Sequence, residues 1–322
     1  MYMNCNNNTI SNNTINKSGQ YGIRVSSNSY DNIIANNSID AQGSTNVGMR
    51  LQYADNTVVS GNDMVGFGIY IEGQLTSVSS HTIFTNNNVN GKTVYYYTGQ
   101  TNLNHENFTG DGTPAQIILV QCTDSMISGY DLSDTSVGIQ LYYSENITIS
   151  NKTARNTVST AQNEGIRLLN NCNENIIEHN YLFNNTDSGI ALFDDCSEII
   201  IRLNNASFNG KAGIELNESN SNKINNNIAK NNIYGLLLNS SSNNCIYGNI
   251  LINNDHNYNE SGVCVGNGDC RSSSNGTPSG GDDDDDDEAV AIPFGNFYLY
   301  FLFLSVISLV LIKRKTITHN SN

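Results

Sequence analysis

Apolar and polar residues alternate in short runs along most of the chain, and the runs recur at a nearly constant interval. In residues 189–210, GIALFDDCSEIIIRLNNASFNG, one alternating pair is Ile190 and Leu192 and the next is Ile199 and Ile201, with Asp, Ser, Glu and Asn turns around them. Alternation of this kind is typical of short β-strands that bury one face. One such unit cannot cover its own apolar face, so the pattern predicts one layer of a stack.

A motif of the form Gly-Ile-x-Leu opens layer after layer at intervals of about 24 residues, and a fixed period of this size indicates a solenoid. Its glycines are Gly22, Gly48, Gly68, Gly138, Gly165, Gly189, Gly213 and Gly235. The interval 68–138 is irregular. The variable third positions are chemically mixed, which predicts an outward ridge selected mainly for solubility and folding; they are Arg24, Arg50, Tyr70, Gln140, Arg167, Ala191, Glu215 and Leu237.

A second motif, in which Asn lies between two apolar positions, follows about ten residues into most layers. Its Asn members are Asn13, Asn37, Asn62, Asn87, Asn180, Asn204, Asn227 and Asn249. Because their spacing matches that of the glycines, we expect the side-chain amides to stack as a ladder, each bonding the ones above and below. A buried Asn without such partners would cost ~1–3 kcal/mol, so the ladder would also fix the register of the coils.

These features predict an all-β fold, a right-handed parallel β-helix of about ten or eleven coils. The β-helix should occupy residues 1–255. Coils that stack at the inter-strand spacing of about 4.8 Å would make a rod on the order of 50 Å long. The N-terminus has neither a signal-peptide pattern nor a cap for the first open sheet edge, so we expect the natural chain to begin further upstream.

The periodicity fades after residue 255. Residues 256–288 are rich in Gly, Ser and Asp and are predicted to form a solvated stalk. Residues 289–312 carry no charge and are long enough to span a bilayer as a helix, and the basic residues that open the tail 313–322 predict that it is cytoplasmic. The membrane is therefore an expected partner, with the β-helix outside the cell. Asn-x-Ser/Thr sequons fit a translocated glycoprotein.

The Gly-Ile-x-Leu and Asn repeats resemble those of the right-handed parallel β-helix proteins of the carbohydrate-binding and sugar-hydrolase superfamily, in the NosD-like branch. The Ile-Pro-Phe-Gly opening at 292–295, the single span and the basic end resemble the C-terminal anchoring tails of archaeal surface proteins. The first resemblance implies the fold. It leaves the function open, because these repeats occur in lyases, hydrolases, epimerases and noncatalytic surface proteins alike.

The net charge of −15 argues against nucleic acid as a partner, because phosphates need a Lys/Arg surface. It also argues against tight binding of an acidic polysaccharide unless cations bridge the two. No CxxC pair is present, and we expect neither a metal site nor a cofactor. Cys264 and Cys270 flank a Gly-rich loop that a disulfide could close. Cys172 and Cys196 recur at the same place in consecutive repeats and are expected to be stacked buried thiols.

The middle of the chain breaks the repeat rules, and local rule-breaking is where function tends to be found. Glu106, Tyr130 and Lys152 occupy positions where the Asn ladder should continue, and aromatic residues concentrate around them. Our first hypothesis is an outward platform on which sugar rings stack, since exposed Tyr offers both apolar area and a hydroxyl. Its residues would be Tyr95, Tyr97, Glu106, Tyr130, Asp131, Tyr142, Tyr143 and Lys152.

The alternatives are an enzyme, a copper protein and a purely structural rod. A polysaccharide-active enzyme would need paired carboxylates or a carboxylate with a basic partner. Candidates are Asp194 with Asp195, Glu178 beside His179, Asp131 with Asp134, and Arg167. They form no compact catalytic motif, so the catalytic residues stay unknown. The His and Met residues are too scattered to favour copper. The sequence thus predicts a membrane-anchored cell-surface β-helix protein with noncatalytic glycan binding or adhesion as its role.

Overall fold

The computed structural model of the protein describes residues 4–16, 20–40, 47–150, 153–155 and 164–270. These residues belong to one compact unit and form a parallel β-solenoid of about 10 turns, which confirms the all-β, parallel β-helix architecture. The predicted membrane helix and tail lie outside the described residues. Within the described ranges, no helix is long and apolar enough to cross a membrane.

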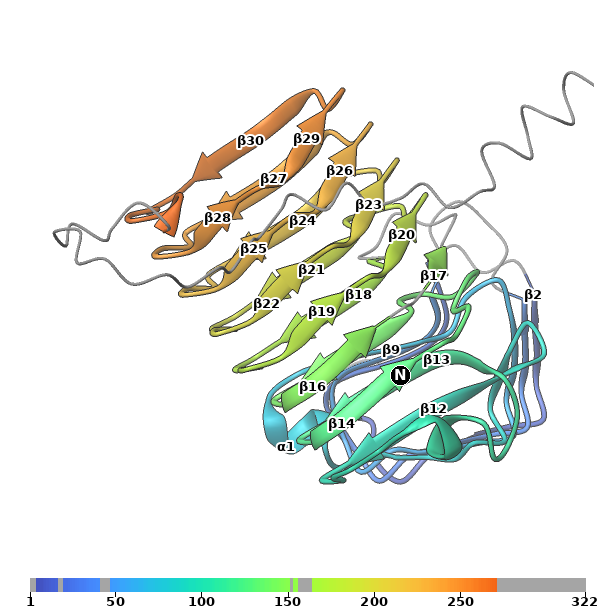
Figure 1. Cartoon of the computed structure of the whole chain (residues 1–322). Coiled ribbons are helices and arrows are strands. Elements are labelled where there is room, and N and C mark those ends of the chain that lie inside the picture. Colours follow the sequence, from blue (N-terminus) through green and yellow to red (C-terminus); the bar gives the residue numbers. More distant parts are fainter. Residues whose placement is uncertain (1–3, 17–19, 41–46, 151–152, 156–163, 271–322) are drawn as a thin grey trace, which may run out of the picture. The chain divides into compact units, whose positions relative to one another are not determined.

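The N-terminal coils, which we call the first stack, run to residue 89 (Figure 1). Their elements are β1 (Thr9–Ser11), β2 (Thr14–Asn16), β3 (Tyr21–Tyr30), β4 (Ile33–Ala35), β5 (Ser38–Asp40), β6 (Val47–Asp55), β7 (Val58–Ser60), β8 (Asp63–Val65), β9 (Ile69–Glu72), α1 (Leu75–Val78), β10 (Thr82–Ile83) and β11 (Asn88–Val89). Equivalent residues of successive coils lie directly above one another. Ile10, Ile34, Val59 and Ile83 form one such apolar column through three parallel pairings.

The second stack begins at residue 92. Its elements are β12 (Lys92–Thr98), the 3-10 helix η1 (His105–Phe108), β13 (Pro114–Val120), β14 (Thr123–Ser128), β15 (Ile139–Tyr142), β16 (Glu145–Ser150), β17 (Thr153–Arg155), β18 (Ile166–Leu169), β19 (Ile176–Glu178), β20 (Tyr181–Phe183), β21 (Ile190–Phe193), β22 (Ile200–Arg202), β23 (Asn205–Ser207), β24 (Ala212–Asn217), β25 (Lys223–Asn225), β26 (Ile228–Lys230), β27 (Tyr234–Asn239), β28 (Cys245–Tyr247), β29 (Ile250–Ile252) and β30 (His256–Ser261). Figure 1 shows its coils rising from β13 to β30 in sequence order.

A hairpin separates the two stacks, which corrects the prediction of one uniform rod. The turn residues Asn90 and Gly91 both have positive φ, 52° and 76°, and β12 runs antiparallel to β11. An Asn-Gly pair in this conformation is the favoured two-residue connection between antiparallel strands. The next pairing, β12 with β13, is parallel again, so a new stack starts from the reversed strand.

The second stack covers the open end of the first. In β13, Ile117 and Leu119 enter the core of the second stack, whereas Ile118 and Val120, on the opposite side of the strand, join the core of the first. β13 is therefore buried on both faces, as parallel strands between two packed layers generally are.

Gln116 closes the exposed edge of β9, the last strand of the sheet β3-β6-β9. The backbone N–H of Ile69 donates to Gln116 Oε1 at 3.0 Å, and Gln116 Nε2 donates to the Ile69 carbonyl at 2.6 Å. The Gln side chain thus replaces a neighbouring strand, and no unpaired edge is left at this point. A Cβ at Gly68 would lie 2.5 Å from Gln116 Oε1, so glycine is required for this approach.

Asn side chains form ladders in both stacks, at the positions that the sequence motif indicates. The side-chain bonds Asn13 to Asn37, Asn37 to Asn62 and Asn62 to Asn87 are each 2.9 Å long. In the second stack, Asn180, Asn204, Asn227 and Asn249 are joined by bonds of 3.0 Å. Two further ladders lie at other turns of the second stack and were missed from the sequence: Asn185, Asn209, Asn232 and Asn254; and Asn222, Asn244 and Asn267.

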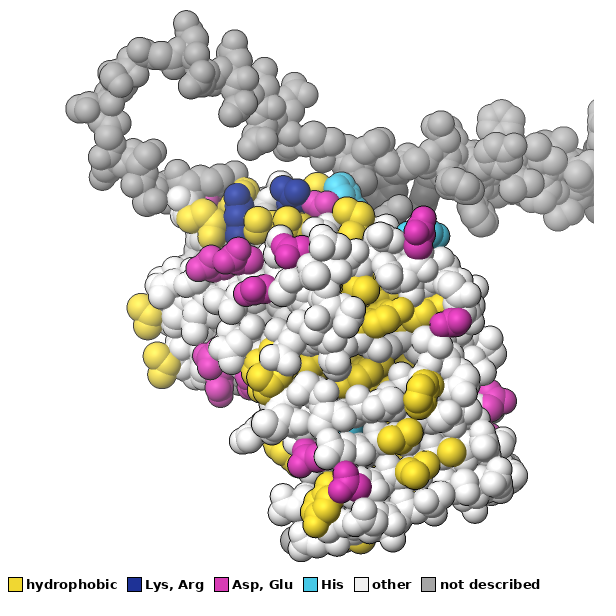
Figure 2. Space-filling model, turned by 90° about the horizontal axis from the view of Figure 1, so that it is seen from below, with side chains coloured by type: hydrophobic (Ala, Val, Ile, Leu, Met, Phe, Trp, Pro, Cys, Tyr) yellow, Lys and Arg dark blue, Asp and Glu magenta, His cyan; other side chains and the backbone are white. Residues whose placement is uncertain are grey.

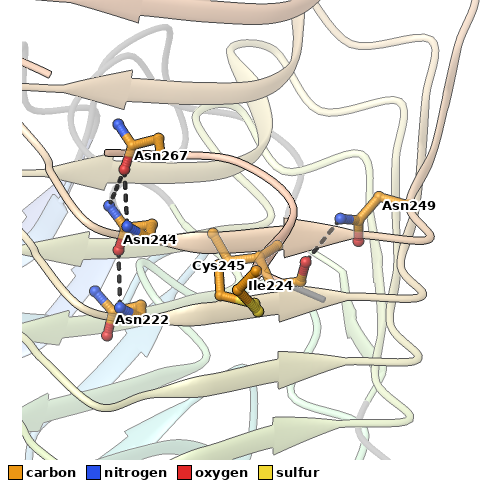
Figure 3. Close-up of a disulfide and its surroundings, with 7 residues drawn as sticks. Asn222, Ile224, Asn244, Cys245, Asn249 and Asn267 are labelled. Atoms are coloured by element: carbon orange, nitrogen blue, oxygen red, sulfur yellow. Dashed lines mark hydrogen bonds between the residues drawn. A yellow bond between two sulfur atoms is a disulfide. The ribbon is translucent and has the colours of Figure 1, made fainter. Parts of the chain in front are cut away.

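The solenoid continues past residue 255, where the periodicity of the sequence fades. β30 pairs with β27, and Asn267 extends an Asn ladder (Figure 3). Cys270 forms a disulfide with Cys245 of the preceding coil, with a Cα–Cα distance of 5.2 Å, and not with Cys264 as predicted. Parallel stacking places Cys245 beside Gly268, one coil later, and so brings Cys270 within reach. The disulfide therefore fastens the last coil to the one before it.

Candidate functional site

The central tyrosines predicted as a platform pack mainly into the core. Tyr95 and Tyr130 are buried, and together with Tyr97 they surround Phe108 at the end of η1, with ring centroids 5.8–6.2 Å from that of Phe108. Edge-to-face contacts of this kind are how aromatic rings fill a core. The three rings stabilise an irregular coil.

The other predicted ligand-binding residues lie apart. Tyr142 is fully buried and donates a hydrogen bond to the backbone of β9. Tyr143 is half-buried in the following turn, while Glu106 and Asp131 are exposed. The side chain of Lys152 lies outside the described residues. The burial of Tyr142, like that of Tyr95 and Tyr130, rules out an exposed platform built from these rings.

The predicted catalytic carboxylates lie mainly in turns. Asp194 and Asp195 follow β21, both exposed and both with positive φ, 57° and 61°. Glu178 forms an ion pair with Arg202 of the next coil at 2.7 Å, and His179 is exposed beside it. These groups are distributed along the coil edges, and the structure does not assemble them into one site.

A different set of charged and aromatic side chains converges where the two stacks meet. On β3, β6 and β9 these side chains point away from the first core, and on the second stack they lie on or beside the outward face of the sheet that contains β18, β21 and β24. We call this set the junction cluster. It consists of Tyr21, Arg24, Arg50, Tyr70, Glu72, Glu164, Arg167, Asp187, Phe193, Lys211 and Glu215.

Arginines and tyrosines alternate through the cluster. Arg24 and Arg50, neighbours in adjacent strands, lie 5.2 and 5.3 Å from the ring centroid of Tyr21. Arg50 and Arg167 lie 5.4 and 5.0 Å from that of Tyr70, and Arg167 also donates a hydrogen bond to the Tyr70 hydroxyl. Guanidinium groups at these distances are attracted by the ring quadrupole. The Tyr70–Arg167 contact links the two stacks.

Four of the five cluster residues on the first stack are partly exposed, whereas Tyr70 is buried. Arg50 forms an ion pair with Glu72, and the two side chains are 15% and 25% exposed. Arg24 donates to Gln52 at 2.6 Å and is half-buried, as is Tyr21. A ligand could therefore reach these groups without unfolding a coil.

The part on the second stack holds an unusual carboxyl group. Glu164 is 1% exposed, and its nearest ion-pairing atom is Arg167 Nε at 3.8 Å, beyond hydrogen-bond distance. Neither carboxyl oxygen of Glu164 has a hydrogen-bond partner among the described residues. Further along the same face, Lys211 contacts Glu215 at 2.6 Å and Asp187 at 3.9 Å.

Burial is the main cause of three raised pKa values in the cluster. It raises the pKa of Glu164 to about 8, although the Arg167 charge acts in the opposite direction. It likewise raises the pKa of Tyr70 to about 12 and the pKa of Asp187 above its ordinary value. Burial penalises the charged form of an acid, so Glu164 is mostly protonated at neutral pH.

The cluster corrects our interpretation of the third motif positions as a solvated ridge. Tyr70, Gln140, Arg167, Ala191 and Glu215 are all buried. Those on the second stack face the first stack across the junction, as the Tyr70–Arg167 bond shows. Three arginines at these positions in an acidic chain could have indicated a functional surface. Locating that surface also required knowledge of the hairpin at residues 90–91, which brings the two stacks together.

Stacked coils, parallel in-register strands and Asn ladders define a right-handed parallel β-helix repeat protein. The sequence matches the right-handed β-helix region over residues 1–117. Over residues 76–267, more than half of the chain, it matches the family described as periplasmic copper-binding protein (NosD). The chain belongs to the NosD family. A comparison with curated protein sequences gives no significant match.

Solved structures of similar fold include a double mutant of the periplasmic alginate epimerase AlgG, at 18% identity and a TM-score of 0.40, covering 75% of this chain and 61% of that one. The chain thus spans less than two thirds of that relative. The A-module of the Azotobacter vinelandii mannuronan C-5 epimerase AlgE4 matches at 11% identity and a TM-score of 0.37, covering 81% of this chain and 77% of that one. PfbA, a surface adhesin of Streptococcus pneumoniae, matches at 10% identity and a TM-score of 0.25, covering 74% of this chain and 71% of that one.

The described residues do not fit a copper site. Copper sites gather several His, Cys or Met side chains. Within the described ranges, no group of three or more His, Cys, Asp or Glu side chains could hold a metal ion. The buried His81 accepts a hydrogen bond from the Thr57 N–H at 3.3 Å through Nδ1. Its role is therefore to satisfy the backbone, and we derive no chemistry that involves copper.

Proposed function

We propose that this chain is an exported glycan-binding protein and that the junction cluster is its binding surface. The observation that carries the proposal is the row of Arg24, Arg50 and Tyr70, which lie in register on three adjacent strands and continue into Arg167. Arginine offers planar hydrogen-bond donors, and the adjoining half-buried ring of Tyr21 offers a stacking face for a sugar.

The surroundings support the choice of this surface. Figure 2 shows a face on which acidic side chains are scattered among uncharged polar groups and separate apolar ones. Of the arginines whose side chains the structure describes, only Arg202 lies outside the cluster. It forms an ion pair with Glu178 on another sheet. The proposal includes the membrane anchor predicted at residues 289–312 and, as the stalk, only the part of the predicted segment 256–288 that follows the last coil; together they would hold the β-helix outside the cell.

Retention on immobilised glycans tests the proposal. Full-length protein should be retained, and Arg50→Gln should weaken retention at least tenfold, because a charge-assisted hydrogen bond contributes about 1.5–3 kcal/mol and each 1.4 kcal/mol is about a factor of ten. Arg202→Gln is the matched control, because it also removes a paired arginine and should leave retention unchanged. Equal retention of the two variants, or no retention of the parent chain on any glycan, would refute the proposal.

Glu164 favours a second candidate, a polysaccharide-active enzyme. A buried carboxyl whose pKa lies near neutrality is suited to general acid or base catalysis. Incubation with pectins, alginates and glucans, followed by assays for new reducing ends, unsaturated products and altered sugar composition, tests this candidate. Activity that Glu164→Gln abolishes would support it, and the absence of any product would exclude it for these substrates.

A further inference from the structure

Three aromatic side chains lie together on the outside of the second stack, away from the junction cluster. Tyr181 and Phe183, both on β20, stack with their ring centroids 5.7 Å apart, and Phe208, in the turn after β23, meets Phe183 edge-to-face at 5.1 Å. Tyr181 and Phe208 are 39% and 46% exposed, and Phe183 is half-buried. We call these three residues the aromatic patch.

The position of the aromatic patch is fixed by strand alternation. Leu182, between the two rings of β20, enters the core of the second stack, so Tyr181 and Phe183 point outward. A single exposed apolar side chain is ordinary, but three rings in mutual contact form a continuous apolar surface, and such surfaces generally mark a contact. The occupant of this surface must lie outside the coil.

The acceptor asparagine of a glycosylation sequon borders the patch. Residues 184–186 read Asn-Asn-Thr, and Asn184 directly follows Phe183. β20 and β23 pair in register, which places Asn184, the first residue after β20, beside Phe208, the first residue after β23. The two residues have the same left-handed turn conformation, with φ of 57° and 59°. A glycan attached at Asn184 would therefore start at the edge of the rings.

The Asn184 amide is available for modification. Its side chain is exposed and makes no hydrogen bond with another residue that the structure describes. Other sequon asparagines are engaged: Asn146 Nδ2 donates to Asp124 at 2.6 Å, and Asn239 Nδ2 donates to Asn217 at 2.7 Å. Attachment of a sugar to Asn184 thus breaks no hydrogen bond between described residues, and it requires no rearrangement of the coil.

We propose that Asn184 carries an N-linked glycan, whose first sugars lie over the aromatic patch. In the transfer, the Asn184 amide nitrogen bonds to the anomeric carbon of a lipid-linked oligosaccharide and loses a proton, while the bond from that carbon to the lipid phosphate breaks and the phosphate leaves with the electron pair. The C–H faces of the sugars cover the rings, and their hydroxyl groups face water. The inference uses the proposed export of the chain and no residue of the junction cluster.

Glycopeptide mapping tests the modification. The full chain is expressed behind an export signal in cells that N-glycosylate exported proteins, and its proteolytic peptides are analysed by mass spectrometry; an exported protein with an occupied sequon, made in the same cells, is the control for transfer. We expect the peptide that contains Asn184 to carry a glycan in most copies, and Asn184→Gln and Thr186→Ala each to remove it. An unmodified Asn184 in cells that modify the control protein overturns the proposal.

Binding of bis-ANS, a dye that fluoresces on apolar surfaces, tests whether the glycan covers the rings. Asn184→Gln should bind at least about twofold more dye than the glycosylated parent, and addition of Phe208→Ser should reverse the increase, because the exposed patch is then smaller. Asn146→Gln is the matched control, since it removes a sequon on another sheet and should leave dye binding unchanged. Equal dye binding by Asn184→Gln and an occupied parent overturns the covering role.

Failure of this inference can be told apart from failure of the proposed function. An unmodified Asn184 together with retention on immobilised glycans that depends on Arg50 overturns the modification and leaves glycan binding standing. An occupied Asn184 in a protein that no immobilised glycan retains supports the modification and refutes glycan binding by the junction cluster.

Discussion

Replacing Asn204 by Ala tests the Asn ladder at a fully buried rung. Asn204 Nδ2 donates to the Ile177 carbonyl at 2.8 Å and to Asn227 Oδ1 at 3.0 Å. Asn204 Oδ1 accepts from the backbone N–H and the Nδ2 group of Asn180, at 2.9 and 3.0 Å. One side chain thus satisfies polar groups in three coils.

The structure sets the size of the effect. In the Ala variant the Ile177 carbonyl and the backbone N–H of Asn180 lose partners in a site with no exposure to solvent. Each buried group left unsatisfied costs about 1–3 kcal/mol, so we expect the free energy of unfolding to fall by about 3–5 kcal/mol. The neighbouring rungs keep the remaining bonds, which limits the loss to the three coils concerned.

Urea unfolding of the full-length chain, followed by circular dichroism, measures this loss. The control is Asn249→Ala, which removes the partly exposed last rung of the same ladder. This change removes its 2.8 Å bond to the Ile224 carbonyl and the bonds that Asn249 Oδ1 accepts from the backbone N–H and Nδ2 of Asn227, at 2.9 and 3.0 Å. Because this rung is open to solvent on one side, water can replace these bonds, so the control should lose less than about 1.5 kcal/mol. A cost for Asn204→Ala no larger than that of the control would refute the argument that ladder bonds hold the coils in register.

Two other predictions concern the junction and pH. Gln116→Ala should lower the free energy of unfolding by about 1–3 kcal/mol and speed amide exchange at Ile69, because the buried Ile69 N–H loses its partner while the Ile69 carbonyl keeps only the 3.3 Å bond from Gln140 Nε2. Gln100→Ala, which removes an exposed side chain that bonds only locally, should change neither. Burial lowers the pKa of His81 from 6.5 to about 4, against a smaller opposing effect of the Asp55 charge. The unfolded chain therefore binds more protons between these values, and stability should fall by about 3 kcal/mol as pH drops from 6.5 to 4. Denaturation at several pH values should show this dependence reduced in His81→Gln, and an unchanged dependence would contradict it.

The coil architecture was predictable because each coil repeats a local rule. The Gly-Ile-x-Leu motif marks the strands that stack in register, as in the pairing of β18 with β21, and the Asn motif marks residues that hydrogen-bond between coils. The end of the solenoid was harder to recognise. β30 is rich in Asn and has few apolar residues, so its place is set by pairing with β27 and by the Cys245–Cys270 bond.

The junction was not predictable from the same rule, because periodicity describes only neighbouring coils. The signal for the reversal was the Asn90-Gly91 pair, which the sequence interpretation overlooked within an irregular interval. The contact between Tyr70 and Arg167 joins residues 97 positions apart. Without knowledge of the hairpin, the sequence does not distinguish Tyr70 and Arg167 from side chains exposed to solvent. The tyrosines of the irregular interval were predicted to form a binding site because of their number. In the structure, Tyr95, Tyr97 and Tyr130 pack around Phe108.

The capping of β9 by Gln116 has a consequence for how this protein can change in length during evolution. A β-helix can gain or lose a coil by duplication or deletion of one repeat, since each coil contacts only its neighbours. In the first stack such an event would move β9 relative to Gln116 and leave a sheet edge open to pairing with other molecules. Repeat number should therefore vary beyond β24, the last strand that contributes a residue to the junction cluster, and stay constant before residue 90. Copy-number variation among relatives would then be confined to one arm of the molecule.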